Sequence, residues 1–223
     1  MMKPSEFKEC AKIDGYDDFM STALACDDLN GEDYARFMPR LFDVVPNRKE
    51  KDPVAMYEAV IEELRKSWTA SENLPFHGPW HHGLVGGILI AALKNSGYDF
   101  TDAQIKEALK RGLMVPAGAC GFLGTCGAAA GLGTAVSIVL RSTPFKKDER
   151  SSALISAGEA IHRVGKLGGP RCCALSTYAT LTLAVITLRK LGYELPSAVM
   201  AGRCRNHGLN GQCHGRRCPY FPK

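Results

Sequence analysis

The stretch GFLGTCGAAAGLGTAVSIVL, residues 121–140, contains no charged side chain, and CCALSTYATLTLAVITL, residues 172–188, is equally uncharged. Each stretch approaches the length of a membrane-spanning helix. Both are dominated by glycine, alanine, serine and threonine, whereas membrane spans are usually richer in leucine, isoleucine and phenylalanine. Such a composition favours central helices that are packed closely on all sides. We therefore expect an all-α protein that does not span a membrane.

Glycines within the first stretch predict how such a helix would pack. Gly124, Gly127 and Gly131 are three and four positions apart, so one face of a helix through them carries no side chains. Another helix, or a ligand, can approach the backbone at that face.

Helix signals also precede these stretches. Asp52 suits an N-cap and Pro53 suits the first helical position. Apolar residues then recur every four positions, at Met56, Val60, Leu64 and Trp68. This pattern predicts an amphipathic helix that begins at Pro53.

Three further helices are expected. One runs from Pro79 to about Ser96 and is stopped by Gly97. Another begins at the capping box formed by Thr101 and Gln104. The third covers about residues 148–164, and its inward-facing residues are expected to be Leu154, Ala157 and Ile161.

The chain divides into three parts by composition. We expect an N-terminal helical extension over residues 1–73, a compact all-α core domain over 74–200, and a basic, cysteine-rich tail over 201–223 that packs on the core. The tail carries the whole net charge of +5, because it contains no acid and leaves 23 basic residues against 23 acidic ones elsewhere. Its basic residues are Arg203, Arg205, Arg216, Arg217 and Lys223.

Three roles are open for the basic tail. It could be a solvated surface, it could meet phosphate or RNA, or it could offset the negative charge of a cluster held by thiolates. The first residues of the chain show no secretory signal, and the nine cysteines cannot all pair. Both points favour the cytoplasm, where thiols stay reduced.

Seven of the cysteines gather at three places in the second half of the chain, while Cys10 and Cys26 are unremarkable. Cys120 follows a glycine turn that leads into the first uncharged stretch. We expect the start of that helix to lower the pKa of the Cys120 thiol, with Cys126 in the first or second turn of the same helix. Small apolar cysteines that fill a helix contact are the alternative.

The second place is the vicinal pair Cys172 and Cys173, which follows the turn Gly168-Gly169-Pro170-Arg171. Adjacent cysteines rarely form an unstrained disulfide with each other. Their side chains diverge by about 100° on a helix, so one can serve a site while the other packs in the core. Arg171 is a candidate to stabilise a thiolate or to bind a substrate carboxylate.

The third place is the tail, where Cys204, Cys213 and Cys218 have spacings that match no standard zinc finger. A structural zinc ion would need a fourth ligand, and His207 or His214 could supply it. A cysteine followed by proline, as at Cys218, also occurs at iron–sulfur sites. Zinc and an iron–sulfur cluster both remain open for the tail.

Histidines form one more candidate group, in the segment FHGPWHHG, residues 76–83. Gly78 and Pro79 interrupt any helix that would join His77 to His81, so a site made of histidines alone is not expected. We expect His81 or His82 to face the site as an acid–base group. A surface position, or a structural role inside the core, is the alternative for each.

The first two cysteine places share one form, in which a glycine turn, a cysteine and an uncharged helix follow one another. This repetition predicts that two helix N-termini converge on one buried anionic object, such as a cluster or a substrate carboxylate.

Residues 116–190 resemble the α chain of iron–sulfur-dependent L-serine dehydratase and the related L-cysteine desulfidases. The resemblance rests on ACGFLGTCGAAAGLGTAVSIVLRSTP and GGPRCCALSTYATLTLA. It implies a 4Fe-4S cluster held by three cysteines, with one iron open to the substrate, and it makes Cys120 and one or both of Cys172 and Cys173 candidate ligands. Residues 77–222 are also similar to an uncharacterised family found mainly in anaerobes, through the GxCGFxGxCGAA, GGPRCC and CPYF motifs.

The leading hypothesis is a cytoplasmic iron–sulfur enzyme of sulfur or amino-acid metabolism, a lyase or desulfidase that acts on a small molecule. Its cluster ligands would be drawn from Cys120, Cys126, Cys172 and Cys173. One alternative is a zinc- or cluster-binding module whose tail docks a partner or RNA, although nucleic acid is not the favoured partner. Another is a thiol redox or sulfur-carrier protein. The glycine-faced helices leave room for a homodimer.

Overall fold

The computed structural model describes residues 37–68, 77–196 and 204–222. Within these residues the chain is helical and contains no β-strand, so the prediction of an all-α fold is confirmed. The elements, with η for a 3-10 helix, are α4 (Arg40–Val44), η1 (Val45–Asn47), α5 (Pro53–Lys66), α6 (Trp80–Asn95), α7 (Asp102–Gly112), α8 (Ala119–Phe122), α9 (Gly127–Val139), α10 (Lys147–Leu167), α11 (Cys173–Lys190), η2 (His207–Leu209) and η3 (Gly215–Arg217).

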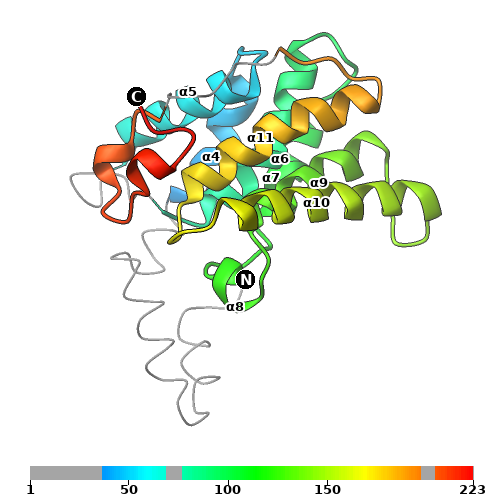
Figure 1. Ribbon diagram of the computed structural model, residues 1–223. Helices are drawn as coiled ribbons and strands as arrows, with labels where there is room; N and C mark the ends of the chain where they lie inside the picture. Colours follow the sequence, from blue (N-terminus) through cyan, green and yellow to red (C-terminus); the bar gives the residue numbers. More distant parts are fainter. Residues whose placement is uncertain (1–36, 69–76, 197–203, 223) are drawn as a thin grey trace, which may run out of the picture.

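Helix α6 lies at the centre of the fold, and every residue from Trp80 to Leu93 is buried. Helix α9 packs against α6, α7, α10 and α11. Figure 1 shows α9 and α10 running side by side, with α11 next to them. The two uncharged stretches of the sequence thus supply helices with neighbours on several sides, as their small residues predict.

The predicted helix starts are confirmed in detail. The Asp52 carboxylate accepts the backbone N–H groups of Val54, at 2.8 Å, and of Ala55. Both hydrogen bonds of the Thr101 and Gln104 capping box are present at the start of α7. Each cap satisfies backbone donors that a helix cannot pair internally.

The first uncharged stretch is not one continuous helix. Gly118 and Gly124 have positive φ angles of 78° and 63°, and between them lies the one-turn helix α8. Helix α9 begins only at Gly127, with Cys126 as its N-cap. The prediction that Cys126 lies inside the first turns of a helix fed by Cys120 is therefore wrong, because α8 ends at Phe122 and the left-handed backbone at Gly124 separates it from α9.

The glycine face has the predicted effect at two of its three positions. A Cβ atom on Gly131 would lie 2.7 Å from the Cβ atom of Val85 in α6, and one on Gly127 would lie 2.2 Å from the His82 ring. Such distances are shorter than side chains tolerate, so the bare face is what lets α9 approach α6. Gly124 belongs to the turn before the helix.

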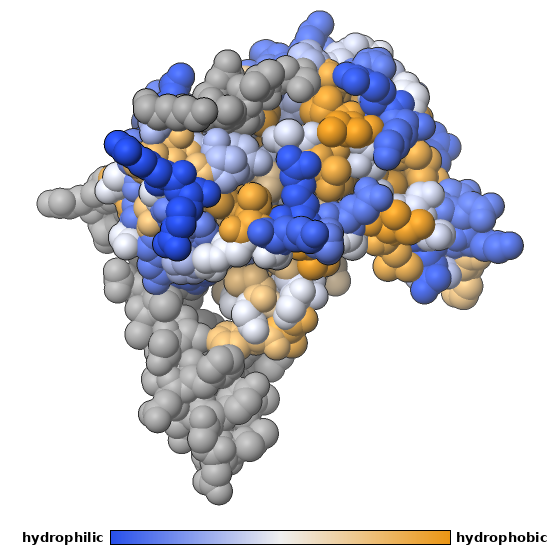
Figure 2. All heavy atoms as spheres, viewed as in Figure 1, coloured by the Kyte–Doolittle hydropathy of each residue, from blue (hydrophilic) through white to orange (hydrophobic). Residues whose placement is uncertain are grey.

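The segment that carries α8 extends from the helical body and has no charged residue between Leu113 and Cys126. Figure 2 shows a neutral to hydrophobic surface at this place. Met114 and Leu123 are 77% and 67% exposed there.

In the described part of the chain, no helix combines the length and apolar character that a membrane crossing requires.

Helix α10 contacts its neighbours through small residues. The expectation that Leu154 faces inward is wrong, because Leu154 is 56% exposed, and the buried residues of α10 are Ser156 and Ala160. The α10 interface with α9 uses small residues: a Cβ atom on Gly133 would lie 2.8 Å from Ala157.

The described part of the tail lies against α5 and the first half of α11 (Figure 1). The Cys204 N–H group donates to the Tyr220 carbonyl at 2.8 Å, which joins the two ends of the tail. The Tyr220 ring packs against Tyr178 of α11, with ring centroids 5.3 Å apart. The proposed domain boundaries at 73/74 and 200/201 fall outside the described residues, as do Cys10 and Cys26.

Candidate functional site

A cavity of about 350 Å³, here called the large cavity, lies where α6, α8, α9, α10 and α11 meet. Seven of its lining side chains carry chemistry: His81, His82, Cys120, Cys126, Arg171, Cys172 and Cys173. They come from segments that are far apart in the sequence. The volume is in the range of about 300–1,000 Å³ that is usual for small-molecule sites.

Two helix starts face the large cavity. Cys126 caps α9, while Cys172 caps α11 and Cys173 is the first residue of that helix. All three line the cavity. The predicted convergence of two helix N-termini is therefore present, and it creates a partly positive environment at the cavity wall.

Burial raises the pKa of thiols that line the large cavity. It raises the pKa of the Cys173 thiol to about 12 and also raises the pKa of Cys120, while the Arg171 charge acts in the opposite direction on both. The expectation that a helix start lowers the pKa of Cys120 is wrong, because α8 has only four residues and burial outweighs its dipole. A neutral buried thiol such as that of Cys173 is a poor nucleophile, which disfavours free thiol chemistry at this residue.

His81 is held by both ring nitrogens. Its Nδ1 lies 3.2 Å from the Gly78 carbonyl and its Nε2 lies 3.1 Å from the Tyr57 hydroxyl. Burial lowers the pKa of His81 to about 3, so the ring is neutral, Nδ1–H donates to Gly78 and the Tyr57 hydroxyl donates to Nε2. Both nitrogens of His81 are thus engaged within the core.

His82 is better placed for proton transfer. Its Nδ1–H donates to the Val115 carbonyl at 2.9 Å, and burial lowers its pKa. The neutral ring then carries its lone pair on Nε2. Since His82 lines the large cavity, it is the stronger candidate for an acid–base group of the two.

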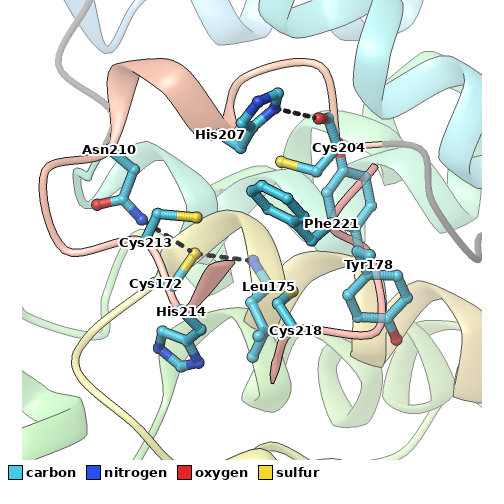
Figure 3. A pocket seen from close by; sticks show the side chains of 11 residues that line it. Cys172, Leu175, Tyr178, Cys204, His207, Asn210, Cys213, His214, Cys218 and Phe221 are labelled. Atoms are coloured by element: carbon cyan, nitrogen blue, oxygen red, sulfur yellow. Dashed lines mark hydrogen bonds between the residues drawn. The ribbon is translucent and has the colours of Figure 1, made fainter. Parts of the chain in front are cut away.

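A second, much smaller cavity, here called the tail cavity, brings the tail cysteines to α11. Cys172, Cys204, Cys213 and Cys218 line it, together with His207, His214 and Asn210 (Figure 3). Its volume of about 20 Å³ is little more than one water-sized particle needs. Cys172 lines both cavities, whereas Cys173 lines only the large one.

Each of the four sulfur atoms at the tail cavity has a backbone N–H partner close in sequence. The Cys172 Sγ accepts from Leu175 N–H at 3.4 Å, and the Cys213 Sγ accepts from Gly215 N–H at 3.4 Å. Backbone groups of Asn206 and Tyr220 likewise favour the thiolates of Cys204 and Cys218, although burial raises the pKa of both thiols. Donors aimed at sulfur stabilise its charged form.

A chain of hydrogen bonds links the two cavities. Burial and the Arg171 charge lower the pKa of His77 to about 4, so its ring is neutral. Its Nδ1 accepts the Cys173 N–H at 3.5 Å, and its Nε2–H donates to the Asn210 Oδ1 at 3.1 Å. The Asn210 amide donates in turn to the Cys172 Sγ at 3.6 Å (Figure 3).

The tail is also anchored on the glycine turn before α11. The His214 Nε2–H donates to the Pro170 carbonyl at 2.7 Å. Gly169 has a φ angle of +79°, and a Cβ atom there would lie 2.3 Å from the His214 ring. Glycine is therefore required at 169 both for the backbone conformation and for the approach of the tail.

The Gly169→Ala variant is expected to loosen the tail. The added methyl group would meet the His214 ring and strain the backbone, so His214 must leave Pro170. Limited trypsin digestion should then cut the tail faster at Arg205, Arg216 and Arg217.

Gly192→Ala is the matched control for this variant. Gly192 has a φ angle of +88°, but nothing lies within 4 Å of a Cβ atom placed there. Equal cleavage rates in the two variants would contradict the docking role of Gly169, because both carry backbone strain and only one carries the clash.

The structure groups the sequence-predicted site residues into two sets. Cys120, Cys126, Cys173, Arg171 and both helical histidines share the large cavity, while Cys204, Cys213, Cys218, His207 and His214 share the tail cavity with Cys172. Sequence reasoning missed Asn210 and the linking role of His77, which have no local signal. Across the described ranges, no three or more His, Cys, Asp and Glu side chains stand ready-formed to hold a metal ion.

The chain matches the family of unknown function DUF5714 over residues 41–221, and it therefore belongs to that family. This agrees with the expected likeness to an uncharacterised family. Comparisons with curated proteins and with solved structures found no match.

Proposed function

We propose that this member of DUF5714 binds an iron–sulfur cluster in the large cavity through Cys120, Cys126 and Cys173 and acts there on a small anionic substrate. The observation that carries the proposal is that four cysteines from three segments line one cavity of about 350 Å³, and of these Cys172 also lines the tail cavity. Cysteine thiolates are the usual ligands of iron–sulfur clusters. With three ligands, a four-iron cluster keeps one iron for a substrate.

The donor set and its surroundings fit such a group. The N-termini of α9 and α11 both face the cavity, and each belongs to a helix of more than ten residues. Their partial positive charges favour a negatively charged object between them. The backbone of Gly78 favours the thiolate form of Cys173, which is the form that binds iron.

Arg171 supports an anionic substrate. It lines the large cavity, and its positive charge acts on Cys120, Cys173 and His77. A guanidinium group binds a carboxylate through two parallel hydrogen bonds, which both holds and orients it.

His82 is the proposed proton acceptor. The bond from its Nδ1–H to Val115 fixes the ring and leaves the Nε2 lone pair available in a cavity-lining residue. A neutral imidazole in that tautomer can take a proton from a substrate carbon or heteroatom.

When bound, the cluster would supply a Lewis-acidic iron for an elimination or a desulfuration. The resemblance of residues 116–190 to the L-serine dehydratase α chain and to L-cysteine desulfidases supports this class of reaction. Such an enzyme would belong in the cytoplasm of an anaerobic organism, where thiols and clusters persist.

Purification of the full chain without oxygen tests the proposal. About four irons and four sulfides per chain are expected, together with the visible absorbance of a 4Fe-4S cluster. Cys120→Ser and Cys126→Ser are expected to lose most of this iron, whereas Cys213→Ser should keep it. Full iron and sulfide in the first two variants would overturn the assignment.

Activity is tested with L-cysteine and L-serine, by release of sulfide or ammonia. Arg171→Gln is expected to raise the KM by at least about 10-fold, since a hydrogen bond to a charged group contributes about 1.5–3 kcal/mol. An unchanged KM would remove Arg171 from the site.

A further inference from the structure

We infer that Cys172, Cys204, Cys213 and Cys218 form a tetrathiolate site for a single zinc ion, and that this ion fastens the tail to the start of α11. The inference concerns the tail cavity and does not depend on the function proposed for the large one. It assigns the fourth ligand to Cys172 of the vicinal pair.

The tail cavity has four cysteine side chains in its lining, which is the number that a zinc ion binds. Four cysteines from the start of α11 and from three points of the tail line the same cavity (Figure 3). Structural zinc sites are four-coordinate and tetrahedral, and four thiolates are one of their common ligand sets. Because the four cysteines complete such a shell, His207 and His214 are left as cavity walls.

The size of the cavity favours one ion over a cluster. A volume of about 20 Å³ accommodates one particle of about the size of water, and a cluster of eight atoms needs several times that space. In the described residues these thiols are not arranged around a metal ion, so zinc binding would require them to rotate toward a common centre. The two cavities therefore differ in what they can hold.

The surroundings of the sulfur atoms suit thiolate ligands. Each sulfur has a backbone N–H partner two or three residues further along the chain, and Cys172 also accepts from the Asn210 amide. Groups that hydrogen-bond to metal ligands orient them and tune the metal. A divalent ion with four thiolates carries net negative charge, and the acid-free, basic tail offsets it.

Beyond a few hydrogen bonds and the Tyr178–Tyr220 ring contact, the tail buries little of its own surface. In the described residues 204–222, only Cys204, Asn206, Asn210 and Tyr220 are buried. The segment contains two short 3-10 turns and no longer helix. Segments that cannot bury a core of their own are commonly stabilised by a structural metal.

Zinc analysis and X-ray absorption at the zinc edge, on the full chain purified without added metal, test the inference. We expect one zinc per chain, with four sulfur neighbours at about 2.3 Å and no nitrogen neighbour. A shell that contains nitrogen would overturn the assignment of Cys172, and a chain that holds no zinc in zinc-supplemented cells would overturn the site.

Variants give a second, independent measurement. Cys213→Ser and Cys218→Ser are each expected to weaken zinc binding by at least about 10–100-fold, the loss usual when even an outer contact of a metal site is removed. Cys120→Ser and His207→Ala are the matched controls and should keep zinc. The zinc content tests the site at the tail cavity, and the iron and sulfide contents test the cluster in the large cavity. Either proposal can therefore be overturned while the other stands.

Discussion

The Cys173→Ser variant is expected to lose iron and keep zinc, whereas Cys172→Ser is expected to lose zinc and keep most of its iron. The two residues are adjacent, but Cys172 caps α11 and joins the tail cysteines, while Cys173 lines only the large cavity. Removing one thiolate from a metal site lowers its affinity by at least about 10–100-fold. Metal analysis of the two purified variants measures the effect.

The pair provides its own control, because both substitutions change one sulfur to oxygen at the start of the same helix, at its N-cap and at its first residue. General damage to the start of α11 would lower both metals in both variants. Loss of the same metal from both would contradict the division of the vicinal pair between two sites.

The Gly112→Ala variant is expected to destabilise the fold strongly. A Cβ atom on Gly112 would lie 2.2 Å from the His82 carbonyl oxygen and 2.7 Å from the Gly83 Cα atom. These are backbone atoms that cannot rotate away, so α6 and α7 must separate. Overpacking of this kind costs about 1–3 kcal/mol or more, which thermal unfolding measures as a shift of about 2–4 °C per kcal/mol.

Gly158→Ala is the matched control for the helix itself. Gly158 lies within α10, and nothing lies within 4 Å of a Cβ atom placed there. Alanine in a helix is favoured over glycine by about 0.8–1 kcal/mol, so this variant is expected to be more stable than the parent chain. If both variants moved the melting temperature in the same direction, close packing at Gly112 would not explain the stability change of the Gly112→Ala variant.

Local features of the fold could be predicted from the sequence because their causes are local. The caps at Asp52 and Thr101 depend on side chains that reach backbone groups two or three residues away. The break at Gly124 was missed, because an uncharged run has the same composition whether a glycine in it is helical or has a positive φ angle. Periodicity predicts that Leu154 faces inward, but α10 packs against α9 through smaller residues.

The candidate site was predictable in its residue types and not in its grouping. Glycine turns before Cys120 and Cys172 predict the large cavity. Different roles are also predicted for Cys172 and Cys173, but that prediction places both on a helix, whereas Cys172 is the extended N-cap of α11. The approach of the tail to Cys172 depends on contacts such as the one from Asn210, which is 38 positions away. No spacing rule covers ligands contributed by separate elements, so histidines within the tail were the nearest candidates.

The hydrogen-bond chain through His77 and Asn210 has a thermodynamic consequence for the two cavities. It closes a ring that contains the Cys172 sulfur and the Cys173 backbone N–H, so the position of the Cys172 sulfur is tied to the start of the helix that carries Cys173. If occupation of one cavity changes the affinity of the other, the reverse effect has the same factor, because coupling free energies are reciprocal. If both proposed metals bind, the zinc supply would then affect how firmly the large cavity holds iron.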